Sequence, residues 1–532
     1  MKKKILALFL VLILGISLLS CVKSAPKEEY QDNILEITAE EEHLTPTEGG
    51  TLNLCMYNVD TLNPLITKSL PNTEILSIMY DSLFTLGDDL YPEYNLCENV
   101  EVSGDGLIYK LKIRDDFIFH SGEKLTAEDV SHSISLLKAS GGALSSKVKN
   151  VSAVSHSGNT VTVTLDAPVF NFISNLTFPI INSKGSVESA INSAIDYLPD
   201  GTGIYKLINY KFNKTLLLTA VDLEDSDKTP YIKDVKIEIV KNRQTAISSL
   251  ENGLCDVLSP HVAKEGEYLK NQSIKEVEIS GGSFVFLGVN NQHTVLLDSE
   301  IRNALSKLIN RDAFFEIKGE NIKKTSIPVH PSSWLFYDMH PSGEYLPDEA
   351  KEILKNKGFT DSDLNGTLDK IILDEKVDLN FEILVNSENP ERLKCAEAIK
   401  KDLAQAGIST YILSVPFNEY QERIAQKSYD LFIGEIQFSQ NQDITSFISG
   451  QENMFGAYKE ELFYALEDAK KLAKTDDIKG AYALICGKLS ENMPVIGLYF
   501  ESDYLLVNNR INGKLTPNIS NIFYKISDWF IY

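Results

Sequence analysis

The segment Tyr109–Val130 (YKLKIRDDFIFHSGEKLTAEDV) most strongly restricts how this chain can fold. Apolar side chains alternate with polar ones through residues 109–119, which predicts a half-buried strand. A turn follows at Gly122. Thr126 and Asp129 then form the pattern of a capping box, in which the Thr126 hydroxyl binds a free N–H of the first helical turn. The segment predicts a strand, a turn and a capped helix, and nothing in it requires ligand chemistry.

The N-terminus has the pattern of a secretory signal. Three lysines at residues 2–4 precede an apolar run of 15 residues, Ile5–Leu19, which is shorter than the roughly 20 residues of a membrane-spanning helix. The run ends in Leu-Leu-Ser-Cys, which resembles a bacterial lipobox and implies cleavage after residue 20 and lipidation of Cys21. The alternative is an ordinary secretory signal with an incidental cysteine. No second segment is apolar enough to cross a membrane.

Residues 21–48 are expected to be a lipidated N-terminus and an acidic tether. Residues 22–48 carry eight acids and two lysines, too polar a composition to fold alone. The whole chain has 532 residues, enough for two or three domains, and a net charge of −24. This charge argues against nucleic acid as a partner, and an acidic solvated surface explains it more simply than a cationic ligand does.

Cysteine and histidine usage gives no sign of enzyme or metal chemistry. Five widely spaced cysteines remain after Cys21, so neither a disulfide scaffold nor a CxxC metal site is expected, although one disulfide stays open. The chain lacks GxSxG, HExxH and Walker A motifs. The eight histidines are scattered, and His120 is interpreted as a turn-anchoring residue rather than a metal ligand.

Alternating and helical patterns follow one another along residues 49–532, which predicts an α/β protein. The expected strands are 52–56, 98–102, 109–119, 159–165, 202–207, 214–218, 232–240, 253–257, 284–290, 379–384, 408–413, 429–436 and 494–500. The expected helices are 74–84, the one capped by Thr126, 243–252, 299–309, 350–358 and 391–406.

Tyr109–Val130 closely resembles the signature of the extracytoplasmic solute-binding proteins that serve peptide and nickel ABC importers. The opening GGTLNLCMYNVDTLNPL, the Gly-Thr-Gly-Ile-Tyr hairpin at 201–205, the strand 284–290 and the closing Ser527–Trp529 are similar to the same family. The resemblance implies a type II-like periplasmic-binding fold with two lobes around a cleft and an extra subdomain. The expected divisions are a signal peptide (1–20), the tether (21–48), lobe I (49–72, 196–285 and 498–532), the extra subdomain (73–195) and lobe II (286–497).

The resemblance implies a membrane-anchored component of an ABC importer that is no enzyme and needs no cofactor. Such a protein captures peptides outside the cell membrane by lobe closure and delivers them to the permease transmembrane subunits, as a monomer held by its lipidated Cys21. A nickel-chelate or sugar ligand is the nearest alternative. A surface receptor or chaperone that keeps the fold without transport is another. An extracellular hydrolase would need a nucleophile and a base, and the sequence shows no such pair.

The ligand site is also implied by the resemblance. An extended ligand would pair with backbone on both sides, at an opening loop and at the strand 433–438. An acid beyond that strand would receive a peptide amine: Asp443 is the candidate and Glu435 its competitor. A helix cap explains Asp443 equally well. The expected ligand-binding residues are Tyr57, Asn58, Val59, Glu435, Ile436, Gln437, Phe438, Asp443 and Tyr499.

The segment 361–369 (DSDLNGTLD) has the first nine positions of an EF-hand-like calcium loop. Its candidate ligands are Asp361, Asp363, Asn365 and Asp369. Position 12 is Ile372, where a bidentate glutamate is needed. We therefore expect no metal, and an Asx-rich turn that satisfies its own backbone is the preferred interpretation.

Overall fold

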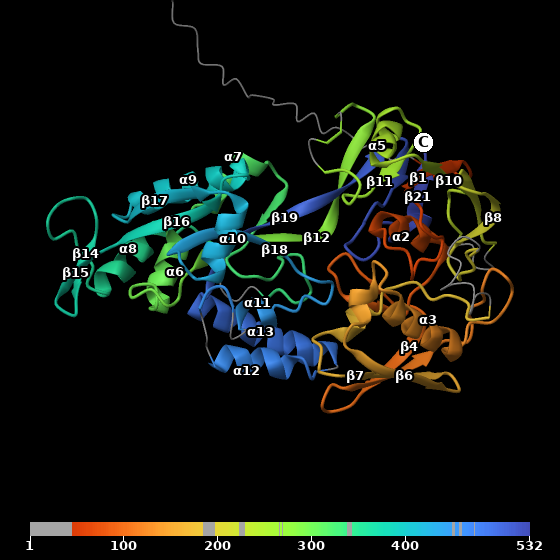
Figure 1. The fold of residues 1–532 in the computed structure, drawn as a ribbon, viewed down its shortest axis with the longest axis horizontal. Helices are drawn as coiled ribbons and strands as arrows, with labels where there is room; N and C mark the ends of the chain where they lie inside the picture. Colours follow the sequence, from red (N-terminus) through yellow and green to blue (C-terminus); the bar gives the residue numbers. More distant parts are fainter. Residues whose placement is uncertain are drawn as a thin grey trace, which may run out of the picture. The chain divides into compact units, whose positions relative to one another are not determined.

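Two long antiparallel strands, β12 (Ile274–Val289) and β19 (Val495–Asn508), lie at the centre of the fold (Figure 1). They pair from Ile274 opposite Asn508 to Gly288 opposite Val495. One end of the pair packs in a hydrophobic core formed by residues between 52 and 237 and by the C-terminal residues 511–529, and the other end packs in two further cores. The two strands therefore join the two halves of the molecule.

The computed structural model describes residues 45–184, 197–222, 229–264, 267–268, 270–337, 343–449, 453–456, 460–472 and 474–532. Pro46–Tyr532 forms one compact unit. The expected signal peptide, Cys21 and nearly all of the acidic tether lie outside the described residues.

The first half contains a four-stranded sheet in the order β1-β10-β9-β8. β1 pairs with β10 in parallel, and the other neighbours are antiparallel. The strands and their helices are β1 Thr51–Tyr57, α2 Leu70–Leu76, β8 Tyr205–Lys211, β9 Thr215–Ala220, β10 Asp234–Val240 and α5 Arg243–Glu251. Ser69 caps α2 and Asn242 caps α5, each by accepting a hydrogen bond from a backbone N–H of the first turn.

A second four-stranded sheet, in the order β4-β5-β7-β6, packs against α3. Its elements are β4 Cys97–Val102, β5 Ile108–Ile113, α3 Ala127–Ser140, β6 Val151–Ser157 and β7 Thr160–Leu165. These elements lie within residues 73–195, where the extra subdomain is expected. Leu111 of β5 and Ile134 of α3 belong to the same continuous core as Leu52 of β1, so the two four-stranded sheets share one interior.

The second half is organised on the sheet β11-β19-β12-β18-β16-β17, with β13 added on β19. Its two faces carry separate cores: Val285 and Leu287 of β12 point into one, and Phe284 and Phe286 into the other. The remaining strands of this sheet are β11 Val257–Leu258, β13 Ile322–Lys324, β16 Asn380–Asn386, β17 Ser409–Val415 and β18 Leu431–Gln437. The helices are α6 Ser299–Leu308, α7 Phe315–Lys318, α8 Pro347–Asn356, α9 Pro390–Ala404, α10 Phe417–Ala425, α11 Thr445–Ile448, α12 Glu460–Ala469 and α13 Thr475–Asn492. The small hairpin strands are β2 Phe84–Leu86, β3 Pro92–Tyr94, β14 Asp369–Ile372, β15 Glu375–Asp378, β20 Ile511–Gly513 and β21 Trp529–Ile531.

Most of the predicted elements are confirmed, and three details are wrong. The helix expected at 74–84 is α2 with a short 3-10 turn to Met79, because Ser69 and the following proline start it earlier and Tyr80 is extended. The strand expected at 109–119 ends at Ile113. The strand expected at 253–257 is limited to β11.

The capping box expected at the start of α3 is confirmed: the Thr126 side chain accepts from the Asp129 backbone N–H, and the Asp129 side chain accepts from the Thr126 backbone N–H. The Asp129 carboxylate accepts hydrogen bonds from the Thr126 backbone N–H at 2.8 Å and from the Thr126 hydroxyl at 2.7 Å. The same side chain accepts from the backbone N–H and the hydroxyl of Ser183 at 2.8 and 2.7 Å. Asp129 therefore holds the helix start to a distant loop, and the Thr126 hydroxyl donates to its carboxylate in addition to the expected capping bond.

Candidate functional site

A cavity of about 740 Å³ lies between elements of the two halves. This volume falls within the range of about 300–1,000 Å³ that is usual for small-ligand sites. One wall consists of α2 and the loops 143–150, 167–179 and 518–522, which belong to the first half. The other wall consists of residues 437–446 and Lys470.

Residues 438–444, which connect β18 to α11, reach across to the first half. The Asn441 side-chain amide donates to the Phe170 carbonyl oxygen at 2.9 Å, and that of Gln440 donates to the Ile519 carbonyl oxygen at 3.1 Å. The Thr177 hydroxyl donates to Gln440 Oε1 at 2.9 Å. This connection is thus held in place at the edge of the cavity by both halves.

One edge of β18 is paired with a neighbouring strand along only part of its length. On one side it pairs with β12 along its whole length. On the other side β16 pairs with it only at Leu431 and Phe432. From Gly434 to Gln437, no described strand pairs with that second side, and Gln437 itself lines the cavity. A strand edge without a partner is what an added peptide strand would use.

The expected residues of β18 do not share one environment. Gln437 and Phe438 line the cavity, and the Phe438 ring contacts Phe284 and Phe447. Ile436 packs on the aromatic core. Glu435 lines a separate depression of about 320 Å³, where Arg392 of α9 donates to its carboxylate at 2.8 Å.

Asp443 lines the cavity and lies two positions before Thr445, the first residue of α11. Its Oδ1 accepts a hydrogen bond from the Thr445 backbone N–H at 2.9 Å. This hydrogen bond closes an Asx turn just before α11, whose N-cap residue is Ile444, and the second carboxylate oxygen of Asp443 accepts no hydrogen bond from the described residues.

The other expected residues lie beside the cavity rather than on its described walls. Asn58 is exposed with a φ of 48°, at the end of β1, and Tyr57 and Val59 flank it half-buried. The Asn72 side-chain amide donates to the Tyr57 carbonyl oxygen at 3.1 Å, which links this loop to α2 of the cavity wall. Tyr499 is fully buried in the core on the opposite face from Phe500, and its hydroxyl accepts from Arg392 Nη1 at 2.7 Å.

Sequence reasoning missed an acidic group in the cavity. Glu74 of α2 lies 2.9 Å from His261, between Glu74 Oε1 and His261 Nδ1, and this hydrogen bond raises the pKa of His261. The other carboxylate oxygen of Glu74 is buried and accepts no hydrogen bond from the described residues. Asp503 also lines the cavity, and burial raises its pKa. No local sequence signal marks the pair, because 187 positions separate Glu74 from His261.

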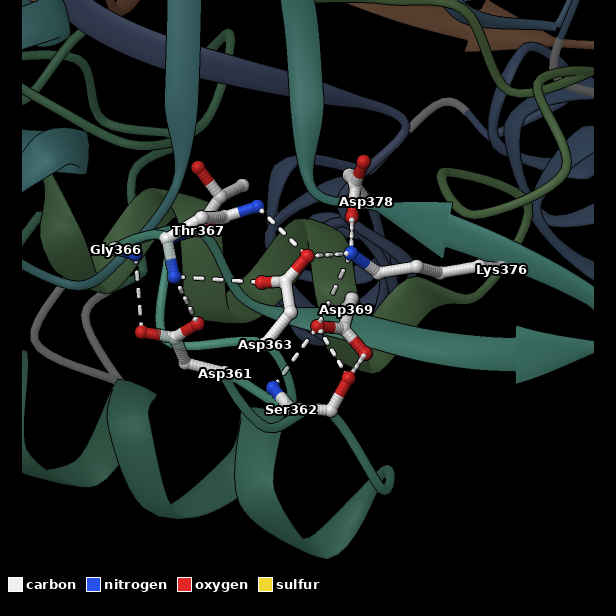
Figure 2. A network of polar contacts seen from close by, with 9 residues as sticks. Asp361, Ser362, Asp363, Gly366, Thr367, Asp369, Lys376 and Asp378 are labelled. Carbon is white, nitrogen blue, oxygen red and sulfur yellow. Dashed lines mark hydrogen bonds and ion pairs between the residues drawn. The ribbon is translucent and has the colours of Figure 1, made fainter.

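The acidic loop 361–369 is a self-satisfied turn around a lysine (Figure 2). Oxygens of Asp361, Asp363 and Asp369 gather within 4.8 Å of one another. Lys376 Nζ lies among the carboxylates, 2.5 Å from Asp363 Oδ2 and 3.7 Å from Asp369 Oδ2. Backbone N–H groups of Asn365 and Gly366 donate to Asp361 at 3.0 Å each. The side chain of Lys376 therefore supplies a positive charge among these carboxylates, and Asp361 accepts from the backbone of its own turn.

Two halves joined by the long strands β12 and β19, with a cavity between them, define a two-lobed binding protein of the type II periplasmic class. The family described as Bacterial extracellular solute-binding proteins, family 5 Middle, matches residues 92–455. The chain therefore belongs to the family 5 extracellular solute-binding proteins. This membership confirms the expected fold class and the expectation that the protein is not an enzyme.

The proteins that are similar to this chain are named for different ligands. The oligopeptide-binding protein AppA of Bacillus subtilis is 24% identical, over 100% of this chain and 99% of its own. The unliganded open form of MppA, a periplasmic murein tripeptide binding protein, has a TM-score of 0.73 at 15% identity, covering 91% of this chain and 98% of its own. NikZ of Campylobacter jejuni with Ni(L-His) has a TM-score of 0.56 at 20% identity, covering 90% and 99%. Among the described residues, no helix is both long and apolar enough to cross a membrane.

Proposed function

We propose that this protein captures peptides outside the cytoplasm and delivers them to the transmembrane subunits of an ABC permease, acting as a monomer. The observation that carries the proposal is the 740 Å³ cavity between the two halves, with the end of β18 in its wall. Closure of the halves around a ligand is the motion expected of such a fold.

Peptide is the leading ligand because the wall offers backbone as well as side chains. A peptide added along Gly434–Gln437 would pair through main-chain hydrogen bonds, which tolerate many side chains. The name of the oligopeptide-binding relative supports the same class. Nickel-chelate binding is the second candidate, because His261 lies in the cavity and the structural relative NikZ binds Ni(L-His).

The ligand class can be tested directly. The full chain, purified in detergent without added ligand, is denatured, and the released molecules are identified by mass spectrometry while nickel is measured by elemental analysis. Peptides at close to one equivalent are expected. Nickel at one equivalent with no peptide would replace the proposal by the metal-chelate alternative.

We also propose that Cys21 is lipidated and anchors the protein to the outer face of the cell membrane through the acidic tether. Two acyl chains would give a stable anchor. Cys21→Ala is expected to release the protein from membranes or to leave its signal uncleaved. Normal processing with full membrane retention of this variant would exclude the anchor.

The domain bounds predicted from the sequence remain a proposal. The single core shared by β1, β5 and α3 supports treating lobe I and the extra subdomain as one rigid body during closure. Lobe II would then move against both of them, about β12 and β19.

A further inference from the structure

Lys147 occupies an unusual position in the cavity wall. It lies in the 3-10 turn Ser145–Val148 that follows α3. Its ammonium group donates to the Thr177 hydroxyl at 2.8 Å and to the Thr177 carbonyl oxygen at 3.3 Å. The same hydroxyl donates to Gln440 of the opposite wall. Lys147 is thus fixed where the two halves meet.

The charge of Lys147 is not compensated within the described part of the chain. No carboxylate there forms an ion pair or hydrogen bond with its ammonium, whereas Lys470, another cavity lysine, pairs with Glu467 at 2.7 Å. Burial lowers the pKa of Lys147 to about 7. An ammonium has three donors, and Thr177 satisfies two. One donor therefore remains for something that enters the cavity, and an anion bound there would stabilise the protonated form of Lys147.

Removing a charge from water without a partner costs stability, so a site of this kind is more readily explained by ligand binding than by folding. The complementary acidic group, Glu74 with Asp503, lines the same cavity and shares no hydrogen bond with Lys147. The cavity therefore presents separate positive and negative groups, as a ligand with one amine and one acid would require.

We propose that Lys147 binds the terminal carboxylate of the captured peptide. This inference rests on the proposed function and adds that the ligand must carry a free acid. A carboxylate replacing water at the third donor would form a charge-assisted hydrogen bond, which contributes more than a neutral one. Loss of that bond is expected to weaken binding roughly 10- to 100-fold.

The test compares two pools of short synthetic peptides with the same random sequences. One pool has free C-terminal carboxylates and the other has C-terminal amides. Each pool is incubated with the full chain in detergent, and the retained peptides are quantified by mass spectrometry. Wild type is expected to retain the acid pool at least about tenfold better than the amide pool.

Three variants test whether Lys147 causes the preference for peptides with a free C-terminal carboxylate. Lys147→Gln is expected to retain both pools alike, Lys147→Arg to keep a preference for the acid pool, and the exposed Lys110→Gln of β5 to behave as wild type. Thermal unfolding of each variant shows whether it is folded. If Lys147→Gln does not fold, the acid preference of Lys147→Arg still tests the role of the positive charge.

Two kinds of negative result would contradict different parts of the proposal. Equal retention of both pools by wild type, or an unchanged acid preference in Lys147→Gln, would overturn the role of Lys147 and leave peptide binding intact. Retention of neither pool by wild type would overturn the proposed function itself.

Discussion

Arg392 donates from its Nη2 to the carboxylate of Glu435 at 2.8 Å. The guanidinium is buried and the carboxylate is 44% exposed, so the pair joins the interior of α9 to the surface of β18. Arg392 also donates to Glu501 at 3.1 Å and to the Tyr499 hydroxyl at 2.7 Å. Glu435 is thus already neutralised, which makes it a poor receptor for a ligand amine.

The first prediction concerns the stability of this pair. Arg392→Met is expected to cost about 3–5 kcal/mol of unfolding free energy, because it leaves the Tyr499 hydroxyl without its donor and Glu501 with Lys318 alone. Glu435→Gln should cost less than about 1 kcal/mol, because its carboxylate is largely solvated. Urea unfolding followed by circular dichroism measures both. Equal losses in the two variants would contradict this division.

The second prediction concerns the ligand amine. Glu74 has a carboxylate oxygen with no hydrogen bond from the described residues, whereas one oxygen of Asp443 accepts from the Thr445 backbone N–H. For a peptide that binds, we expect Glu74→Gln to weaken affinity by roughly tenfold or more and to abolish the difference between the free and the N-acetylated peptide.

Asp443→Asn is the matched comparison, because the asparagine side-chain oxygen can keep the Asx-turn hydrogen bond from the Thr445 backbone N–H. Its affinity for both peptides should stay close to that of wild type in calorimetry. If Asp443→Asn selectively weakens binding of the free-amine peptide and Glu74→Gln has no effect, then Asp443, as predicted from the sequence, binds the ligand amine.

The third prediction concerns the capping box. Asp129→Ala removes the acceptor of four hydrogen bonds, two from Thr126 and two from Ser183, and leaves buried donors unsatisfied. A loss of at least about 3 kcal/mol is expected. Thr126→Ala removes one of those bonds and should cost about 1 kcal/mol. Neither should change the ligand affinity of the folded protein, and a large affinity loss at normal stability would place this segment in the site.

The sequence predicted the features that depend on neighbouring residues, and it did not predict contacts between residues that are far apart along the chain. Tyr109, Leu111 and Ile113 are every second residue of β5, and all three are buried. The sequence predicted this because alternate side chains of a strand point to the same face. Asp298 likewise caps α6 as expected. Lys147 and Glu74 were missed because their partners are 30 and 187 positions away. Composition alone does not indicate such contacts, and only the folded arrangement brings them into one cavity.

The fourth prediction concerns the acidic loop. Because Lys376 lies among Asp363, Asp369 and Asp378, neither added calcium nor a chelator should change the thermal midpoint of the wild-type protein. In Lys376→Gln the carboxylates lose their cation, so calcium should raise the midpoint of that variant. Lys351→Gln, an exposed change on α8, is the control and should not respond. A calcium-dependent midpoint in wild type would restore the metal site.

The last prediction concerns His330, a buried histidine beside the cavity. Its ring packs edge-on against Phe500 at 4.8 Å, and Nδ1 accepts from the Ser332 backbone N–H at 3.1 Å. Nε2 is buried without a partner among the described residues. Burial lowers the pKa of His330 to about 4 from its ordinary 6.5. The folded state therefore resists protonation, while the unfolded state takes up the proton near pH 6.5.

Between pH 6.5 and 4 the unfolded state binds more protons, so this contribution to stability is complete above about pH 6.5 and is lost as the pH falls to about 4. The unfolding free energy should fall by up to about 1.4 kcal/mol per pH unit in that window. His330→Asn keeps an acceptor but cannot titrate there, so its slope in urea unfolding should be shallower by that amount. His156→Asn, an exposed change in β6, should keep the wild-type slope. Parallel slopes for wild type and His330→Asn would show that another group controls acid sensitivity.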